Sequence, residues 1–473
     1  MNFNDFSLLE KKSDVVGNEM FNLMKELFPI CRSITGNGVR QTLSIIQKII
    51  PLEIHEIPSE TKVFDWDIPK EWNIRDAYIL DPNGEKIIDF QKSNLHVLNY
   101  SVPVNKKISL QELKKHLHTI PEKPDLIPYV TSYYSENWGF CMTHNQFLNL
   151  KEGEYHVVID STLEKGSLTY GEYFIPGKTD QEILLSCYVC HPSMCNDNLS
   201  GVVLLTFLAK YLKNFENFYS IRFLFVPETI GSITWINRNE KNLVNIKHGL
   251  VATCLGDSGK FTYKKSREGN NEIDVTVVAT LQNAKLNYNV VDFFPWGSDE
   301  RQFCSPGFNL PVGSLIRSMY GKSEFSEYHT SADNLDFMNK NSLSESFSIY
   351  FRIIYELEKN SNNSNLINEK NPSSKITKKT VSQNDNSEKF LNLNPKCEPQ
   401  LGKRGIYHQL GGQVDQSEQR EMEFAIFWIL NLSDGKNSLH DISERSGIPL
   451  EQISKVVEIL STTKLLKKIE NDP

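Results

Sequence analysis

The sequence predicts an α/β fold: a mostly parallel sheet covered by helices, with a small β-rich inserted domain and a C-terminal winged helix-turn-helix. Between residues 161 and 360, short apolar runs alternate with amphipathic stretches, as in the βα units of parallel sheets. Between residues 61 and 160, short β-prone runs are separated by turn sequences. Residues 401–473 contain three amphipathic segments and then a β-prone run, which is the element order of a winged helix-turn-helix.

Length and composition are those of a multidomain globular protein. The chain has 473 residues, of which 39% are hydrophobic and 23% charged, so about three domains are expected. A formal net charge of -8 excludes global attraction to nucleic acid or to an anionic membrane. We see no signal peptide and no run of about 18 apolar residues, and the eight cysteines indicate free thiols. A cytoplasmic protein is therefore expected.

The first elements are two helices, because apolar residues recur at helical spacing through residues 14–50. Between these helices lies the Gly-rich turn CRSITGNGVR, which carries Arg32 and Arg40. The two arginines could bind a substrate carboxylate or a neighbouring carboxylate. A surface connection between two helices is the favoured interpretation.

The inserted domain, at 61–160, is expected to contain strands at 77–80, 86–90, 95–100, 138–143 and 155–159. The turn Asp81-Pro82-Asn83-Gly84 indicates a hairpin, because Pro presets φ and Asn-Gly tolerates positive φ. An aromatic tract in this domain consists of Tyr129, Tyr133, Tyr134, Trp138 and Phe140. The tract could cover a pocket, although packing in the hydrophobic core of the inserted domain is the favoured interpretation.

The main domain is predicted at 1–60 and 161–360, on both sides of the insertion. Its sheet is expected to use the apolar run that begins at Ile183 and strands at 219–226, 249–255, 275–279 and 311–316. Helices are predicted from Ser200 and over 343–357. Because strands and helices alternate, the sheet should be mostly parallel and covered on both faces.

The C-terminal part divides into a polar linker at 361–400, rich in Asn, Ser and Lys, and a winged helix-like domain at 401–473. Helices are predicted at 418–432, 438–446 and 449–463, with a strand at 465–469. This domain has 9 Lys and Arg residues against 11 Asp and Glu residues, whereas DNA recognition needs a basic face. DNA binding is therefore not expected, while contacts within a homo-oligomer remain compatible with the sequence.

Candidate site residues follow the ends of the predicted strands. His191 and Asp197 come after the first strand, Glu228 after the second and Asp257 after the third. Parallel strand ends meet at one edge of a sheet, so these side chains are expected to lie together. Structural roles, such as a helix cap for Asp197 and a turn for Asp257, are the alternatives.

Two later motifs add ligand types to this edge: Gly297-Ser298-Asp299-Glu300 and Tyr328-His329-Thr330-Ser331-Ala332-Asp333. A two-metal hydrolase needs a shared carboxylate, further His and carboxylate ligands, and a separate Glu that deprotonates water. The combination therefore favours a metal-dependent hydrolase.

The ordered motifs resemble those of the co-catalytic zinc aminopeptidases. The matching positions are His191, Asp197-Asn198-Leu199-Ser200-Gly201, Glu228, Asp257, Ser298-Asp299 and Tyr328-His329-Thr330 with Asp333. The whole chain more closely resembles a bacterial subfamily of aminopeptidase-like proteins, with a β-rich insertion and a C-terminal winged helix, that is often linked to polysaccharide biosynthesis. Its signatures are matched by CRSITGNGVR, IPYVTSYY, SCYVCHPSMCNDNLSG and EPQLGKRG.

The resemblance implies a zinc aminopeptidase-like fold and a cofactor of one or two Zn²⁺ ions. It implies that Asp197 bridges two ions, that His191 and Asp257 complete one site, and that His329 completes the other. Glu228 would be the general base or a ligand, Tyr328 would donate to the oxyanion, and Asp299 would be a ligand or orient one. The expected activity is cleavage of an N-terminal aminoacyl amide bond in a peptide or small aminoacyl-amide substrate.

Two departures from the family pattern leave other functions open. The family usually has a Glu-Glu pair where this chain has Glu228-Thr229, and His191 precedes Asp197 by only 6 residues (197 − 191). A one-zinc site, an inactive binding or regulatory protein, and a deacylase or amidohydrolase in surface-polysaccharide metabolism are the alternatives. A structural zinc knot at Cys187, Cys190 and Cys195 is a further alternative.

Overall fold

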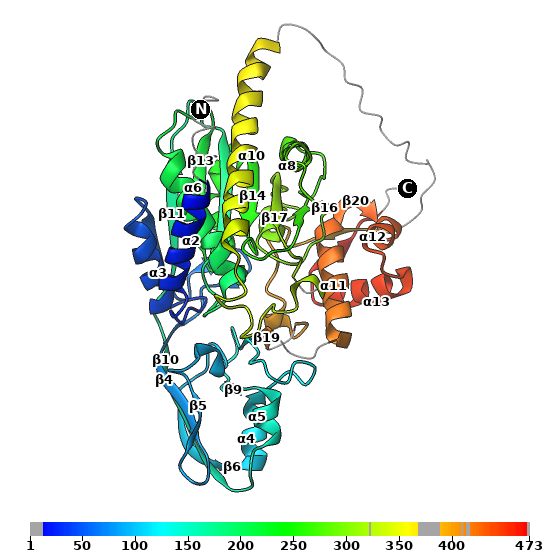
Figure 1. Ribbon diagram of the computed structural model, residues 1–473. Coiled ribbons are helices and arrows are strands. Elements are labelled where there is room, and N and C mark those ends of the chain that lie inside the picture. Colours follow the sequence, from blue (N-terminus) through cyan, green and yellow to red (C-terminus); the bar gives the residue numbers. More distant parts are fainter. Residues whose placement is uncertain (1–12, 321–322, 368–387, 408–409, 413–416, 471–473) are drawn as a thin grey trace.

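The computed structural model describes residues 13–320, 323–367, 388–407, 410–412 and 417–470, and its centre is an eight-stranded sheet (Figure 1). The four middle strands are parallel, in the order β13 (Ser220–Val226), β12 (Glu182–Tyr188), β14 (Ile246–Ala252) and β17 (Val312–Ile316). One edge is formed by β11 (Ser167–Ile175) and β1 (Glu53–Pro58), and the other by β15 (Phe261–Lys264) and β16 (Tyr288–Val291). The predicted α/β class is confirmed.

Both faces of the sheet are buried, because successive residues of a strand point to opposite sides. In β12, Ile183 and Leu185 belong to one hydrophobic cluster, while Leu184 and Tyr188 belong to another. The first cluster includes α2 (Ser13–Leu27), α3 (Asn37–Gln47), α6 (Ser200–Leu212), α8 (Glu272–Asn283) and α10 (Lys340–Ile367), and the second includes α7 (Ile230–Asn239) and α9 (Glu300–Phe303). Figure 1 shows α2 and α6 beside the long α10.

The predicted strand at 275–279 is wrong, because this stretch lies within α8. Its run of β-branched residues favoured a strand. However, Asn271 and Asp274 form a capping box that begins a helix. The buried Ile273, Val277 and Leu281 recur at helical spacing, so the helix is the arrangement that buries the apolar face.

A second sheet holds much of the stretch between β1 and β11. Its antiparallel strands have the order β5 (Lys86–Asp89), β4 (Glu71–Leu80), β10 (Glu154–Glu164) and β6 (Val104–Ser109). In Figure 1 this sheet projects from the main sheet at the end where α3 lies. The predicted strand at 95–100 is instead a 3-10 turn, Asn94–His96, followed by isolated bridges. The predicted strand at 138–143 is shortened to β9 (Phe140–Cys141).

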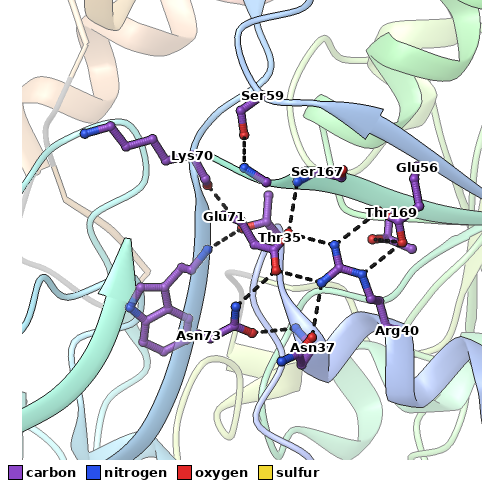
Figure 2. Close-up of polar contacts among 12 residues, drawn as sticks. Thr35, Asn37, Arg40, Glu56, Ser59, Lys70, Glu71, Asn73, Ser167 and Thr169 are labelled. Carbon is purple, nitrogen blue, oxygen red and sulfur yellow. Dashed lines mark hydrogen bonds and ion pairs between the residues drawn. The ribbon is translucent and has the colours of Figure 1, made fainter. Parts of the chain in front are cut away.

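Arg40 ties the two sheets together (Figure 2). Its guanidinium donates to both carboxylate oxygens of Glu56 in β1, at 2.9 and 3.1 Å, and to both oxygens of Glu71 in β4, at 2.7 Å each. Glu71 also accepts from the Ser167 backbone N–H at the start of β11. Arg40 therefore binds neighbouring carboxylates, the second of the three roles that the sequence left open, and not merely the favoured surface connection.

The C-terminal unit is a three-stranded sheet with three helices. The sheet order is β20 (Asp434–Ser438), β18 (Lys389–Asn392) and β21 (Leu466–Lys468), and the helices are α11 (Ser417–Leu432), α12 (Leu439–Ser446) and α13 (Leu450–Thr462). The predicted linker at 361–400 is wrong at both ends, because α10 continues to Ile367 and β18 pairs with β20 and β21. Residues 368–387 of that prediction lie outside the described residues.

Residues 395–407 and 410–412 run back from this unit onto the rest of the molecule; we call them the C-terminal strap. The Trp66 indole N–H donates to the Glu398 carbonyl at 2.8 Å, and Arg404 pairs with Asp65 at 2.6 Å. β19 (Gly411–Gly412) pairs with β8 (Val130–Thr131). Within the described chain, no helix has both the length and the apolar character needed to cross a membrane.

Candidate metal centre

Parallel strands bring predicted site residues to one edge of the main sheet. β12 ends at Tyr188 and β13 ends at Val226, and the two strands are paired in parallel register. The loops that follow them carry His191 and Glu228. This is the edge at which open α/β sheets place their ligands.

Three potential ligands form a compact trio at this edge: His191, Asp197 and His329. Their ligand atoms lie within 4.8 Å of one another. His329 Nε2 is 2.9 Å from Asp197 Oδ2, and His191 Nε2 is 3.8 Å from the same oxygen. Burial lowers the pKa of His191 to about 4, which keeps its imidazole neutral and able to bind a cation.

Surrounding groups hold the loop that carries Asp197. The Asp333 carboxylate accepts hydrogen bonds from the backbone N–H groups of Cys195, Asn196 and Asp197, at 3.1, 2.6 and 2.9 Å. The Tyr188 hydroxyl donates to Asp197 Oδ1. Asp197 Oδ2 is therefore the carboxylate oxygen that faces the two histidines.

Arg32 holds the neighbouring His191 loop from inside the protein. Its side chain is 1% exposed, and it donates to the His191 carbonyl at 2.8 Å and to the Leu27 carbonyl at 2.7 Å. The favoured interpretation of Arg32 as part of a surface connection is therefore wrong. A helix end and a loop both leave carbonyl groups inside the protein here, and the guanidinium satisfies them.

Glu228 lies beside His191, and Asp299 lies beside the turn that follows Glu228. Glu228 Oε2 is 3.9 Å from His191 Nε2. Burial raises the pKa of Glu228 well above its ordinary value, and the charges of Asp299 and Asp197 raise it further. Asp299 Oδ1 accepts the Thr229 backbone N–H at 2.7 Å, so Asp299 orders the turn that follows Glu228. Glu228 therefore holds a proton more tightly than an exposed glutamate does.

Aromatic rings enclose the trio. Tyr328 stacks on His329, with ring centroids 3.8 Å apart, and burial raises the Tyr328 pKa so that its hydroxyl stays protonated. Tyr129 lies 5.2 Å from the His191 ring and 5.1 Å from the His329 ring. The favoured prediction, that the aromatic tract packs in the inserted domain's own core, is wrong for Tyr129. The Tyr129 backbone N–H donates to the His329 carbonyl at 2.8 Å, so this residue packs against the trio.

Asp257 lies apart from the trio. Its Oδ1 accepts the Ser318 hydroxyl at 2.6 Å, and its Oδ2 accepts the Asn196 side-chain amide at 2.9 Å. Among the described residues, no group of potential ligands includes Asp257. The structure therefore does not bring Asp257 to His191 as the ligand pair that the family resemblance implied.

The cysteines contribute no zinc knot within the described residues. Cys187 and Cys195 belong to the hydrophobic core, and no group of potential ligands there contains two cysteines. Cys190 Sγ lies 3.4 Å from His191 Nδ1, and Cys190, His191 and Glu228 form a second group of ligand atoms within 4.8 Å of one another.

Two residues that touch this centre were missed from the sequence. Tyr188 is the last residue of an apolar strand, and its hydroxyl at that position was the available signal. Arg301 directly follows the Ser298-Asp299-Glu300 motif, and it donates to Thr229 Oγ1 at 3.1 Å. Neither Tyr188 nor Arg301 matched a metal-ligand pattern, so neither was identified from the sequence.

The residues of the trio fit a zinc ion. Two imidazoles and one carboxylate are the three protein ligands of many catalytic zinc sites, which keep a fourth position open. Asp197 Oδ2 and His329 Nε2 are both buried and lie 2.9 Å apart, but among the described residues neither atom makes a well-aligned hydrogen bond. A cation would remove the free-energy cost of leaving these atoms unpaired.

Comparisons with known proteins agree with this picture. A family model described as a domain of unknown function, DUF4910, matches residues 21–360, and a winged helix-turn-helix model matches residues 388–468. The first match spans more than half of the chain. The chain belongs to the DUF4910 family.

Relatives of this DUF4910 protein carry peptidase names. A Clostridium acetobutylicum protein, named as a polysaccharide biosynthesis protein with an aminopeptidase-like domain, is 57% identical over 459 residues, or 97% of this chain and 98% of that protein. A crystal structure from the same organism, described as a candidate peptidase, is 54% identical, covers 99% of this chain and 100% of its own, and has a TM-score of 0.74.

The zinc aminopeptidase of Bacillus subtilis shares the fold. It is 12% identical, and the match covers 72% of this chain and 94% of the aminopeptidase with a TM-score of 0.54. The predicted resemblance to aminopeptidase-like proteins with a C-terminal winged helix is confirmed. This DUF4910 chain therefore has an aminopeptidase-like fold of the peptidase-type hydrolases.

Proposed function

We propose that this protein is a zinc-dependent hydrolase of the aminopeptidase type, which cleaves an N-terminal aminoacyl amide bond. The observation that carries the proposal is the trio of His191, Asp197 and His329, with Glu228 beside it. The trio would hold one Zn²⁺ ion. A second ion would need further carboxylates, and Asp257 is bound to Ser318 and Asn196 while Thr229 occupies the usual place of an acid.

The protein's own residues have distinct parts in the proposed reaction. A bound zinc ion supplies Lewis acidity and lowers the pKa of water. Glu228 accepts a proton from the attacking water and later delivers it to the leaving amine. Tyr328, held by its stacking on His329, donates a hydrogen bond to the developing oxyanion. Tyr129 limits the access of bulk water to the two histidines.

A second candidate is a deacylase that acts on an N-acylated amino sugar. It is favoured by a cleft of about 830 Å³ between the opening helices and the inserted domain, lined by polar side chains that include Asn37, Asn73 and Gln91. The cleft reaches Ser193 and Ser331, which lie next to the trio in the sequence. The name of the Clostridium acetobutylicum relative also includes polysaccharide biosynthesis.

The substitution Glu228→Gln tests the proposed chemistry. We expect purified, zinc-loaded protein to hold about one zinc per chain and to hydrolyse members of a panel of aminoacyl amides or N-acyl amino sugars. Because a general base contributes about 10² to 10⁴ in rate, Glu228→Gln should lower kcat by that factor while zinc content stays nearly unchanged. Steady-state kinetics and metal analysis provide the measurements.

The other possible outcomes of this experiment distinguish the roles of Glu228 and the two candidate functions. Loss of most of the bound zinc in Glu228→Gln would make Glu228 a ligand. Full activity of Glu228→Gln would contradict the assignment of the base. Wild-type protein that holds no zinc after loading and dialysis would refute the proposed function. Cleavage of amino-sugar amides alone would favour the second candidate.

A further inference from the structure

We propose that Glu398, in the C-terminal strap, is a positioning residue for the active site, and that it acts through Arg301 on the turn that carries Glu228. This inference rests on the proposed function. It assigns a role in the main site to a residue beyond position 360, where the DUF4910 match ends.

Arg301 connects the strap to the turn. Its Nε lies 3.0 Å from Glu398 Oε2, and its Nη2 lies 3.4 Å from Glu398 Oε1. The same Nη2 donates to Thr229 Oγ1 at 3.1 Å. The side chains of Arg301 and Glu398 are only 14% and 16% exposed. A largely buried carboxylate that faces the guanidinium through both of its oxygens fixes the direction of that group.

The turn that follows Glu228 needs support from surrounding groups, because the Thr229 backbone has a φ of 64°. The left-handed region is unfavourable for a β-branched residue and persists only where the surroundings enforce it. Asp299 binds the Thr229 backbone N–H, and Arg301 binds its hydroxyl. These two contacts fix the backbone directly after Glu228, and therefore the direction from which Glu228 reaches the trio.

Hydrogen bonds to neighbouring segments hold the C-terminal strap, and therefore Glu398, in place. The Glu398 backbone N–H donates to Gln302 Oε1 at 3.0 Å, and its carbonyl accepts the Trp66 indole N–H at 2.8 Å. The preceding residue, Cys397, donates its backbone N–H to Ser305 Oγ at 2.9 Å. Glu398 is thus anchored to α9 and to the segment between β1 and β4, and its neighbour Cys397 is anchored to the segment after α9.

Loss of the Glu398 charge has a specific consequence. Arg301 would become a largely buried cation without its main partner. Glu228 and Asp299 carry the other carboxylates whose charges act on Arg301. The guanidinium would turn toward these acids, withdraw from Thr229 and engage the general base. Misplacement of a reacting group by about 1 Å can cost about 10²-fold in rate.

The test compares Glu398→Gln in the full chain with Glu388→Gln as a matched control. Glu388 lies in the same C-terminal unit, but it pairs with Lys468. For Glu398→Gln we expect a 10- to 100-fold fall in kcat, with KM and zinc content nearly unchanged. Hydrogen exchange of the backbone amides in 229–233 should become faster. The control should match the wild type in all four measurements.

Three further variants separate a positioning role of Glu398 from a general effect on the structure. In a Glu228→Gln background, Glu398→Gln should lower the residual rate no further, because the base through which it acts is absent. Arg301→Lys, which keeps the charge but loses the planar fork, should retain more activity than Arg301→Ala. An equal loss of kcat in the Glu228→Gln background would overturn the proposal.

The hydrogen-exchange measurement does not depend on the hydrolytic activity of the protein. If wild-type protein hydrolyses no substrate, the proposed function fails, yet faster exchange of 229–233 in Glu398→Gln would still support the positioning role. Exchange in Glu398→Gln equal to that of the Glu388→Gln control would overturn it, whatever the activity.

Discussion

At the scale of single residues, the metal centre depends on one carboxylate oxygen. Asp197 Oδ1 is bound by Tyr188, while Oδ2 faces His191 and His329. The backbone of Asp197 is in turn held by Asp333. The position of Oδ2 is therefore set by contacts within the protein, which is the arrangement that gives a metal site its geometry.

Asp197→Asn should remove most of the bound zinc without unfolding the protein. The substitution keeps the shape of the side chain but removes its charge, so we expect zinc affinity to fall by more than the 10- to 100-fold typical of losing an outer partner. Metal analysis after dialysis, with circular dichroism as the folding check, gives the measurement. Asp257→Asn is the comparison and should retain zinc, since Asp257 lies outside the trio. Equal zinc loss in both variants would contradict the one-ion site.

Residue-level sequence reasoning succeeded where position along a strand decides the outcome. His191 and Glu228 follow the ends of β12 and β13, so parallel pairing alone predicted that they would meet. The place of Asp257 could not be predicted in this way. It depends on hydrogen bonds to Asn196 and Ser318, each 61 residues away in the sequence, and no local pattern encodes them.

At the scale of elements, the junction between the two sheets is an ionic contact. Arg40, from α3, joins β1 to β4 through Glu56 and Glu71 (Figure 2). Figure 2 also shows Glu71 bound to Asn73 and to Ser167. Hydrogen bonding to Arg40 is the largest influence on Glu71 and lowers its pKa from 4.5 to about 2.

This junction should lose its stabilising effect in acid. A carboxyl group whose pKa is lower in the folded state stabilises that state above its unfolded pKa of 4.5, and the effect disappears as pH falls toward 2. Urea unfolding followed by circular dichroism should therefore depend less on pH between 4.5 and 2 in Glu71→Gln than in the wild type. Glu152→Gln, which changes an exposed glutamate, serves as the control. Parallel pH dependence of all three proteins would contradict the prediction.

Element types were predictable where the apolar pattern was long, as in α10 and β13. They were not predictable where local and tertiary preferences conflicted. The stretch 275–279 has strand-forming side chains, yet the capping box at Asn271 and the burial of one helical face produced α8. The polar composition near 389–392 likewise concealed β18, which is stabilised by pairing with β20 and β21.

At the scale of the whole molecule, the C-terminal unit packs on the main sheet through its helix-turn-helix. Arg445, at the end of α12, donates to the Arg267 carbonyl at 2.8 Å, and Arg267 in turn pairs with Asp434 at 3.2 Å. Trp296 of the main domain lies 4.9 Å from Phe424 in α11, ring to ring. This packing commits Arg445 of the unit to a contact within the chain.

The full-length protein should therefore bind duplex DNA only weakly. The basic residue of α13, Lys455, is paired with Glu451 at 2.7 Å, and Glu458 adds negative charge to the same helix. We expect a Kd no tighter than the 10⁻⁴ to 10⁻⁶ M typical of non-specific binding, with binding lost as salt rises from about 50 to 200 mM. Fluorescence anisotropy with labelled duplexes gives the measurement. Tight, sequence-selective binding would show that this face recognises DNA.

The pairing of β19 with β8 affects when the protein can become active during its synthesis. Gly411 and Gly412 hydrogen-bond to Val130 and Thr131, next to Tyr129 in the wall of the site. Glu398 likewise reaches Arg301 from late in the sequence. A ribosome exposes the chain from its N-terminus, and contacts distant in sequence form last. We therefore expect the nascent chain to carry an incomplete candidate centre until residue 412 has emerged from the ribosome, when translation is nearly finished.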